Sequence, residues 1–390
     1  MLMAQPSRID RYLGCIVGGA AGDALGYPIE FDSERKISRH FGEGGIATLT
    51  EAAYYGHEAA ARFSDDTQMT LFTAAGLLSR AASGSLPDEE ADTRAIWDAY
   101  GEWYTTQRYH RRTPRPERRL WITSLDALNV LRAPGTTCLG AIGDGVPGAP
   151  EEPQNHSKGC GGIMRVAPVG LYYAARRKDC DDHRDIAMRV GARAAALTHG
   201  HTFGWLPAAV HARIVASVLD VPVVEDARAR REALSDLILA ETDAACEAYA
   251  HHTHAPMLQE RVRRAVELAA AAPVGGVDYA RDLDAIHELG EGWVGEEALY
   301  IAVYAVLAHA DDLKRALRCA VNHRGDSDST GSVTGNILGA YLGMKEVRSA
   351  MELEILEQVD LLEEIALELY HAEDPNAVTS RGTPWGTLYQ

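Results

Sequence analysis

Glycine recurs every four residues in two segments near opposite ends of the chain. The two series are Gly14, Gly18, Gly22, Gly26 and Gly331, Gly335, Gly339, Gly343. Inside a helix each glycine costs up to about 1 kcal/mol relative to alanine, so the repeat needs a structural reason. Glycines four residues apart leave one helix face without side chains, and another backbone can approach that face closely. We therefore predict that both segments are closely packed helices. In one arrangement they pack against each other. The alternative is that some of these glycines only form turns.

Helical periodicity also dominates the rest of the chain. Apolar residues recur at three- and four-residue spacing over residues 67–82, 184–199, 207–220, 257–272, 295–310 and 349–370. Alanine is abundant, β-branched runs are short, and no alternation of strands and helices is visible. These patterns predict an all-α protein, a compact orthogonal multi-helix bundle that forms a single domain over residues 1–390. Residues rich in glycine, proline or charge predict long functional loops at 32–62, 104–120 and 132–162.

Composition limits where the protein works and what it binds. The formal net charge of −18 argues against nucleic-acid binding, because phosphate contacts need clustered Lys and Arg. The six cysteines are scattered without a CxxC pair, which predicts a reducing cytoplasm. No run of about 18 uncharged apolar residues occurs, so no membrane helix is expected. We expect the arginine run at 108–119 to be a solvated face, with contact to a phosphate or an acidic partner as the alternative.

The heptapeptide GDSDSTG at residues 325–331 places two carboxylates beside three hydroxyls. A calcium loop that starts at Asp326 would need a bidentate glutamate at its twelfth position, where Ile337 stands. A phosphatase nucleophile would need a buried strand before the first aspartate, and the preceding residues do not resemble one. The heptapeptide is also typical of a helix start with Asp328 or Ser329 as the cap, and this interpretation stays open.

A second acidic motif, Ser64-Asp65-Asp66, precedes the helical pattern that begins at Thr67, and it too is typical of a helix start. Adjacent carboxylates repel each other, and capping alone does not require them. Two such pairs, each with a hydroxyl beside it, suit a hard cation with octahedral oxygen coordination. If the two helix starts converge, four carboxylates could hold two Mg²⁺ or Mn²⁺ ions.

Five motifs in order resemble the ADP-ribosylglycohydrolases, a family that includes dinitrogenase reductase-activating glycohydrolase, the ADP-ribosylarginine and ADP-ribosylserine hydrolases and the crystallin J1-like proteins. The motifs are GDALGYPIEF, SDDTQMTL, SKGCGGIMRVAPVGL, LTHGH and GDSDSTGSVTGNILGA. The resemblance runs from about residue 11 to about residue 345, so it does not include the C-terminal helix and tail from about 346. It implies an all-α fold with a binuclear Mg²⁺ or Mn²⁺ centre. The implied metal ligands are Ser64, Asp65, Asp66, Asp326, Asp328 and Ser329.

The implied reaction is hydrolysis of the glycosidic bond at C1″ of ADP-ribose, which frees a modified acceptor, arginine being the commonest. The metal ions would grip the ribose diol and orient or acidify a water. Glu30, or an aspartate such as Asp328, would act as general acid or base. Without the resemblance, Glu30 would be a surface glutamate beside a proline turn. The alternative function is an ADP-ribose-binding or transferase-occluding protein with little catalysis. Expected partners are ADP-ribose or an ADP-ribosylated protein, and the chain would be a monomer or a small homo-oligomer.

A glycine-rich loop supplies the implied substrate contacts. Backbone N–H groups in SKGCGGIMR can approach a diphosphate or adenosine closely, although a plain turn is the default for such a run. Lys158 stands where some family members have an aromatic residue, and Cys160 stands where many have asparagine, whose hydrogen bonds are lost. His199 in LTHGH matches a substrate-side histidine of some members, with a structural role as the alternative, and His201 is less secure. The implied substrate-binding residues are Ser157, Lys158, Gly159, Cys160, Gly161, Gly162, Met164 and His199.

Overall fold

The computed structural model describes residues 5–108, 120–180 and 182–389. Within these ranges the regular structure is helical, with isolated β-bridges and no strand, so the all-α prediction is confirmed. The arginine run lies outside the described residues apart from Arg108, and its predicted role stays a prediction. The α-helices are α1 (Arg8–Gly26), α2 (Glu34–Phe41), α3 (Leu49–Tyr55), α4 (Asp65–Ala82), α5 (Glu89–Arg108), α6 (Thr136–Asp144), α7 (Ala167–Ala175), α8 (His183–Ala196), α9 (Thr202–Val218), α10 (Ala227–Ala248), α11 (Ala255–Ala270), α12 (Tyr279–Leu289), α13 (Gly295–Ala308), α14 (Leu313–Val321), α15 (Ser327–Leu342), α16 (Met344–Ala350) and α17 (Val359–Tyr370).

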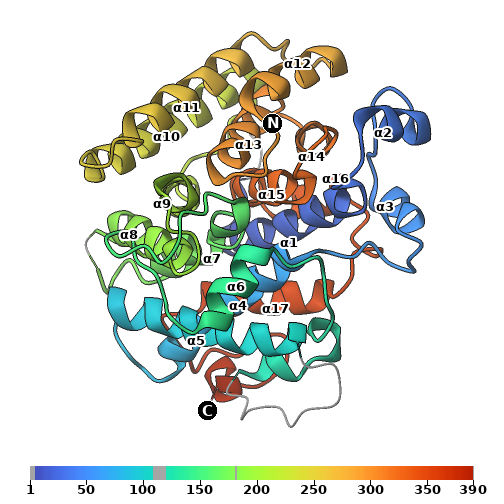
Figure 1. Ribbon diagram of the computed structural model, residues 1–390. Helices are drawn as coiled ribbons and strands as arrows, with labels where there is room; N and C mark the ends of the chain where they lie inside the picture. The colour runs from blue at the N-terminus through green and yellow to red at the C-terminus, as the bar shows by residue number, and fades with distance from the viewer. Residues whose placement is uncertain (1–4, 109–119, 181, 390) are drawn as a thin grey trace.

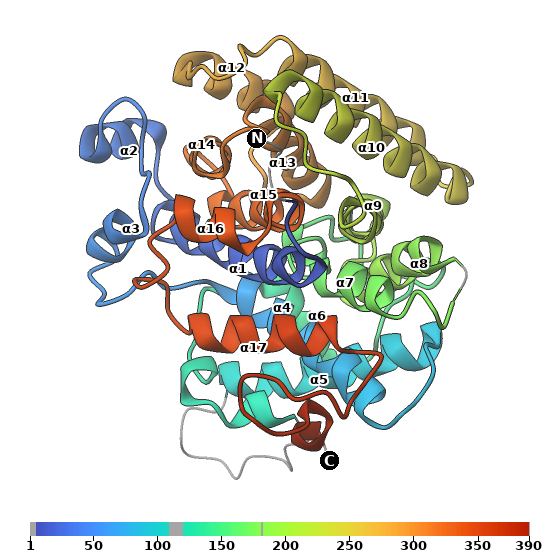
Figure 2. The same cartoon turned by 180° about the vertical axis from the view of Figure 1, so that it is seen from behind.

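The two glycine series meet at the centre of the molecule. Helices α1 and α15 lie side by side there, as the two opposite views show (Figures 1 and 2). A Cβ atom added to Gly18 would lie 2.7 Å from the carbonyl oxygen of Gly335, and one added to Gly335 would overlap the backbone at Gly18. The interface continues through the pairs Gly14 with Gly339 and Gly22 with Gly331. The predicted close packing is confirmed, and its reason is contact between two backbones.

The remaining helices enclose this pair (Figure 1). Helices α10, α11 and α12 form one edge of the molecule, whereas α4, α5 and α6 lie on the opposite side of α1 and α15. Helix α1 starts with a capping box in which the Ser7 hydroxyl and the Asp10 carboxylate each accept from the other's backbone N–H. Helix α9 begins at Thr202, five residues before the predicted start, so Pro207 lies inside it.

All three predicted loops contain helical residues. Residues 32–62 include α2 and α3, and residues 104–108 form the end of α5. Residues 132–162 include α6, which is followed by Gly145 in the left-handed conformation with φ 74°. Conversely, the helix predicted over 349–370 is interrupted before α17. There Ala61 donates its N–H to Ile355 and accepts from the N–H of Glu357, so this stretch combines local turns with bonds to a distant segment.

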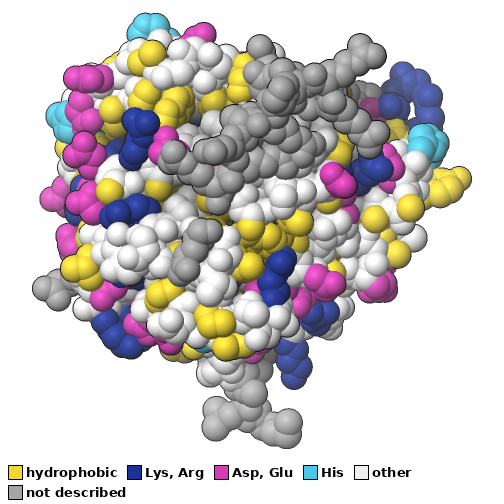
Figure 3. Space-filling view, turned by 90° about the horizontal axis from the view of Figure 1, so that it is seen from below, with side chains coloured by type: hydrophobic (Ala, Val, Ile, Leu, Met, Phe, Trp, Pro, Cys, Tyr) yellow, Lys and Arg dark blue, Asp and Glu magenta, His cyan; other side chains and the backbone are white. Residues whose placement is uncertain are grey.

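The surface is mixed in character. Figure 3 shows basic, acidic and hydrophobic side chains interspersed over the face seen from below, where they alternate over short distances. Among the described residues, the helices lack the combination of length and apolar character that crossing a lipid bilayer requires.

Candidate metal and substrate site

The N-termini of α4 and α15 carry the two acidic motifs. Ser64 is the N-cap of α4, as predicted, and its Oγ accepts the N–H of Asp66 at 3.1 Å. The N-cap of α15 is Asp326, so the prediction of Asp328 or Ser329 as the cap is wrong by two or three residues. The helix already begins at Ser327, and the Asp326 carboxylate accepts the N–H of Ser329 at 3.2 Å.

The two helix starts meet in space. Ser329 donates its hydroxyl to Oδ2 of Asp66 at 2.8 Å, which joins residues 263 positions apart. The backbone N–H of Ser329 also lies 2.9 Å from Oδ1 of Asp328. Because both ends are N-terminal, each directs the positive end of its helix dipole at the carboxylates.

Asp23, in the last turn of α1, fixes the start of α4. Its carboxylate accepts the N–H of Ser64 at 2.8 Å, the N–H of Thr67 at 3.0 Å and the hydroxyl of Thr67. It is fully buried, and burial together with the charge of Asp328 raises its pKa to about 7. Asp23 stands within the motif GDALGYPIEF, but no role was predicted for it. Its position in the glycine-rich, apolar second half of α1 was the available signal.

A cavity of about 370 Å³ opens above the paired helix starts. Among the described residues no Lys or Arg lines it, although carboxylates from three separate segments do. The predicted site residues Ser64, Ser157, Lys158 and Gly162 do not line it. Those that do are Glu30, Asp65, Asp66, Gly159, Cys160, Gly161, Met164, His199, Asp326, Asp328 and Ser329.

The carboxyl groups at this cavity are buried and repel one another. Burial first, and then the neighbouring acids, raises the pKa of Asp65, Asp66 and Asp328 well above the usual range. Glu30 follows the 3₁₀ turn Tyr27–Ile29, and the same two causes raise its pKa to about 10. Its Oε2 is buried without a hydrogen-bond partner among the described residues. The site therefore concentrates oxygen ligands and acidic groups, and within the described parts of the chain no basic side chain lines it.

The glycine-rich loop packs against His199. A Cβ atom on Gly159 would lie 3.3 Å from Nε2 of His199, and one on Gly161 would lie 2.9 Å from its Cε1. His199 is buried and its Nδ1 lies 2.8 Å from the hydroxyl of Thr198. Burial lowers the pKa of His199 to about 3, so the ring is neutral. These glycines are thus needed for contact with the imidazole, whatever else the loop binds.

The two positions that depart from the family motif have definite partners. Cys160 lies beside the acidic cluster, with Sγ 2.7 Å from Oδ2 of Asp326. Lys158 does not line the cavity and pairs with Oε1 of Glu296 at 3.0 Å. The cysteine therefore touches a predicted metal ligand, whereas the lysine is already engaged.

An aromatic pair at the cavity was missed by the sequence analysis. Phe31 and Trp293 stack with ring centroids 5.6 Å apart and planes 21° from parallel, and both line the cavity. Phe31 is 75% exposed and Trp293 is 36% exposed, so both rings face solvent at the rim. The exposed aromatic directly after Glu30 was a usable signal for Phe31. Nothing in the sequence linked it to Trp293, which is 262 positions away in the chain.

A comparison with protein families identifies the family to which the chain belongs. Residues 4–378 match the family model described as ADP-ribosylglycohydrolase. The chain belongs to the ADP-ribosylglycohydrolase family. Membership supports a hydrolase of the ADP-ribosylglycohydrolase type, a glycosidase that acts on ADP-ribosylated substrates.

Curated relatives match this ADP-ribosylglycohydrolase chain over most of their length. An uncharacterised protein of Archaeoglobus fulgidus is 27% identical over 362 residues, which is 93% of this chain and 96% of the relative. The uncharacterised Escherichia coli protein YegU is 28% identical over 366 residues, 90% of this chain and 94% of the relative. ADP-ribosylhydrolase ARH3 of Gallus gallus is 23% identical over 370 residues, 88% of each.

A solved structure shows the same fold as this family member. It is titled an ADP-ribosylglycohydrolase-related protein complex, and it superposes with a TM-score of 0.60 at 24% sequence identity. The match covers 94% of this chain and 99% of that chain. At this identity the likeness concerns the fold alone.

Proposed function

We propose that this protein is a metal-dependent hydrolase that cleaves the bond at C1″ of ADP-ribose and releases ADP-ribose from a modified acceptor. Arginine is the acceptor that we propose. The observation that carries the proposal is the cavity itself. Carboxylates of Glu30, Asp65, Asp66, Asp326 and Asp328 share about 370 Å³ without a lining Lys or Arg in the described chain. Buried charges of one sign are costly unless a counter-charge pairs with them.

The donor set fits hard divalent cations. Carboxylate and hydroxyl oxygens are the ligands that Mg²⁺ and Mn²⁺ prefer. The unpartnered Oε2 of Glu30 and the raised pKa values of the neighbouring carboxyls both indicate a site completed by positive charge. When bound, two such cations would grip the ribose diol and acidify a water. They would be held by Ser64, Asp65, Asp66, Asp326, Asp328 and Ser329.

The residues of this chain have distinct tasks in the proposed reaction. Hydrolysis breaks the bond from C1″ to the acceptor nitrogen, joins a water oxygen to C1″ and returns a proton to the leaving nitrogen. Glu30 lines the cavity and its buried Oε2 has no hydrogen-bond partner among the described residues, so we assign it the proton transfers. Its carboxyl would hand a proton to the leaving nitrogen and then take up the proton of the attacking water. The hydroxyl of Ser329 would orient Asp66, with which it already bonds.

The rim is suited to an aromatic or sugar-phosphate ligand. The stacked rings of Phe31 and Trp293 offer flat apolar surface at the cavity. The N-terminal turn of α6 also lines it, with Thr136 and Thr137, whose hydroxyls can donate to polar groups. An ADP-ribose group has both a purine ring and phosphates, so it matches both kinds of lining.

The test is release of ADP-ribose from arginine-, serine- and nucleobase-linked substrates in Mg²⁺ or Mn²⁺. We expect release from at least one substrate, loss of release in EDTA, and a loss of at least about 100-fold in Asp328→Ala. Asp98→Ala, which changes an exposed aspartate of α5, is the matched control and should retain full activity.

Two results would contradict the proposal. Release that persists both in EDTA and in Asp328→Ala would exclude a metal-dependent reaction at these carboxylates. Binding of ADP-ribose by the purified protein, with no release from any of the three substrates, would favour the binding or occluding role instead. Isothermal titration with free ADP-ribose distinguishes that second result from an inactive preparation.

A further inference from the structure

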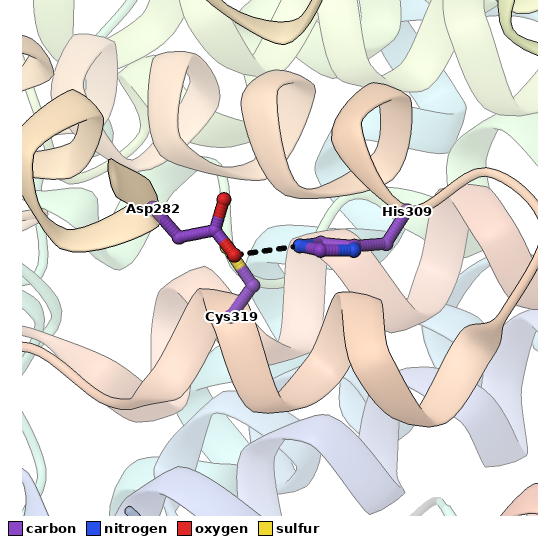
Figure 4. A group of neighbouring side chains, drawn as sticks. All are labelled: Asp282, His309 and Cys319. Carbon is purple, nitrogen blue, oxygen red and sulfur yellow. Dashed lines mark hydrogen bonds and ion pairs between the residues drawn. The ribbon is translucent and has the colours of Figure 1, made fainter. Parts of the chain in front are cut away.

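A second cluster of potential metal ligands lies among α12, α13 and α14. Asp282 belongs to α12, His309 follows the last residue of α13, and Cys319 belongs to α14. One carboxylate oxygen, one imidazole nitrogen and the thiol sulfur all lie within 4.8 Å of one another. Figure 4 shows the three side chains pointing toward one another from their separate segments. None of the three lines the acidic cavity described above.

The Asp282 carboxylate is oriented by its neighbours. Its Oδ1 accepts the hydroxyl of Tyr304 at 2.7 Å and a guanidinium N–H of Arg281 at 3.1 Å. Its Oδ2 lies 2.9 Å from Nε2 of His309. One oxygen is thus held by two donors, and the other faces the imidazole and the thiol. Metal-binding carboxylates are commonly fixed in this way, with the second oxygen hydrogen-bonded to surrounding groups.

The cluster adjoins a small cavity with an outlet. All three side chains line a space of about 60 Å³, together with Glu43, Gly44 and other residues. That volume accommodates water. Glu43 is exposed, so the cavity reaches the surface beside a carboxylate. A cation therefore has a path inward, and a water has room beside the three ligands.

The basic residues at this cavity are already engaged. Arg315 pairs with Asp311 at 2.8 Å and with Asp312 at 2.9 Å. Arg318 donates to the carbonyl of Gly44 at 2.6 Å, and its guanidinium lies 4.5 Å from the ring centre of Tyr279. The charge of Arg315 is therefore paired with two acids, which lowers the repulsion that an entering cation would meet, and the Arg318 guanidinium is held against Gly44 and Tyr279.

We propose that Asp282, His309 and Cys319 form a structural binding site for a thiophilic divalent cation such as Zn²⁺. Thiolate, imidazole and carboxylate are the ligands that Zn²⁺ takes in a tetrahedral site, and a cavity water can supply the fourth. Mg²⁺ and Ca²⁺ favour oxygen ligands and do not select a thiol. The ligands therefore separate this site chemically from the oxygen-rich cavity, and the proposal does not depend on the proposed function.

Binding has a defined proton balance. The cation takes the Nε2 lone pair of His309, so the imidazole proton shifts to Nδ1, which has no hydrogen-bond partner among the described residues. The thiol proton of Cys319 leaves to solvent. The thiolate and the carboxylate then face the two charges of the ion, while Arg281 stays paired with Oδ1 of the same carboxylate. No bond other than the three metal–ligand bonds and the bond to water is formed.

The consequence of binding is mechanical. The three ligands come from successive helices, so one ion would tie α12, α13 and α14 together. Helix α14 leads into Asp326, the N-cap of α15, only five residues after its end at Val321. The bound ion would therefore stabilise the connection from α14 to α15, which carries half of the acidic cavity, without taking part in the chemistry of that cavity.

Co²⁺ is the probe, because cobalt bound to a thiolate gives a sulfur-to-metal charge-transfer band in the near ultraviolet and oxygen ligands do not. The full-length protein, freed of metal and kept reduced, is titrated with Co²⁺ and then with Zn²⁺. We expect one equivalent of Co²⁺ to produce the band and Zn²⁺ to abolish it by displacement. Cys319→Ser should lose the band, and Asp282→Asn and His309→Gln should bind Co²⁺ at least tenfold more weakly.

Cys160→Ser is the matched control, since Cys160 is the cysteine beside the acidic cavity. It should keep the band. Absence of the band in the wild-type protein, its survival in Cys319→Ser, or its loss in Cys160→Ser would each overturn the proposal. Far-ultraviolet circular dichroism of metal-free Cys319→Ser should match the wild type, and if that variant is misfolded, loss of the band in Asp282→Asn replaces it as the deciding result.

Discussion

Glu30 illustrates how much one side chain depends on its surroundings. A glutamate beside Pro28 has no distinctive signal by itself, yet here it is 9% exposed and surrounded by acids. Burial and the charges of Asp328 and Asp326 raise its pKa to about 10, which makes it a proton carrier rather than a fixed charge. The same feature makes the residue testable, because glutamine resembles its protonated form.

For Glu30→Gln we expect a loss of hydrolysis of about 100-fold or more, because an amide cannot exchange a proton with water or acceptor. Stability should be unchanged or higher, since the substitution removes one member of a repulsive cluster. Initial rates and thermal unfolding of the same preparation check both parts. An active variant, or one that is inactive because it unfolds, would contradict the assigned role.

Glu368 offers a pH test at a residue remote from the site. It is fully buried in α17, where Tyr389 donates to its Oε2 at 2.7 Å and its Oε1 has no partner among the described residues. Burial raises its pKa from 4.5 to about 8. Between these two values the folded protein holds a proton that the unfolded chain has lost, so this group lowers stability as pH rises through the window.

Glu368→Gln should remove this contribution. Its stabilising effect should be larger at about pH 9 than at about pH 5, because the wild-type penalty is fully present only above the folded pKa. Urea unfolding of both proteins at the two pH values measures the difference. An equal effect at both values would show that the carboxyl titrates normally.

At the scale of helices, the close contact between Gly18 and Gly335 predicts how much a substitution there changes stability. Gly335→Ala should lower the free energy of unfolding by about 1–3 kcal/mol or more, because the new methyl group overlaps the backbone at Gly18. Gly101→Ala is the matched control. This glycine also lies inside a helix, α5, but a Cβ there meets nothing within 4 Å, so the change should stabilise by up to about 1 kcal/mol. Equal effects in urea unfolding would mean that helix propensity, not backbone contact, explains the glycines.

The elements show what the sequence could and could not predict. Four-residue glycine spacing predicted α1 and α15, because close backbone contact gives so costly a repeat a reason, although Gly343 lies just past α15 with φ 85°. Helix α6 was missed, because nine residues between Gly135 and Gly145 show too little periodicity within a stretch rich in glycine and proline. The break before α17 was missed for another reason. Its backbone pairs with Ala61, and no local pattern encodes a partner almost 300 residues away.

The candidate site divides in the same way. Acidic residues clustered in two short motifs were visible in the sequence, and their convergence was the stated condition for a metal site. Asp23 escaped notice because its role is to hold the start of α4, a contact that exists only after folding. The aromatic pair of Phe31 and Trp293, and the trio of Asp282, His309 and Cys319, likewise combine residues from separate helices and loops. Tertiary packing alone brings such residues together.

At the scale of the whole molecule, some of the acidic residues that contribute to the formal net charge of −18 are buried. The acids around the cavity are buried at the junction of α1, α4 and α15, where water screens them poorly. The outer surface, by contrast, mixes basic and acidic side chains on the face shown in Figure 3. Repulsion between these acids therefore destabilises the packing of the central helices. Cation binding should raise the free energy of unfolding of the whole protein.

We expect Mg²⁺, added to chelator-treated protein at about 100 times its Kd, to raise the free energy of unfolding by about 2.7 kcal/mol per site. Asp328→Asn should reverse the pattern. Without the cation this variant should be more stable than the wild type at neutral pH, because a carboxyl whose pKa is raised by burial and by Asp326 no longer has to be accommodated. With Mg²⁺ it should gain much less. Urea unfolding of both proteins, with and without Mg²⁺, gives the four values required, and an equal Mg²⁺ effect in both would place the cation somewhere other than at these carboxylates.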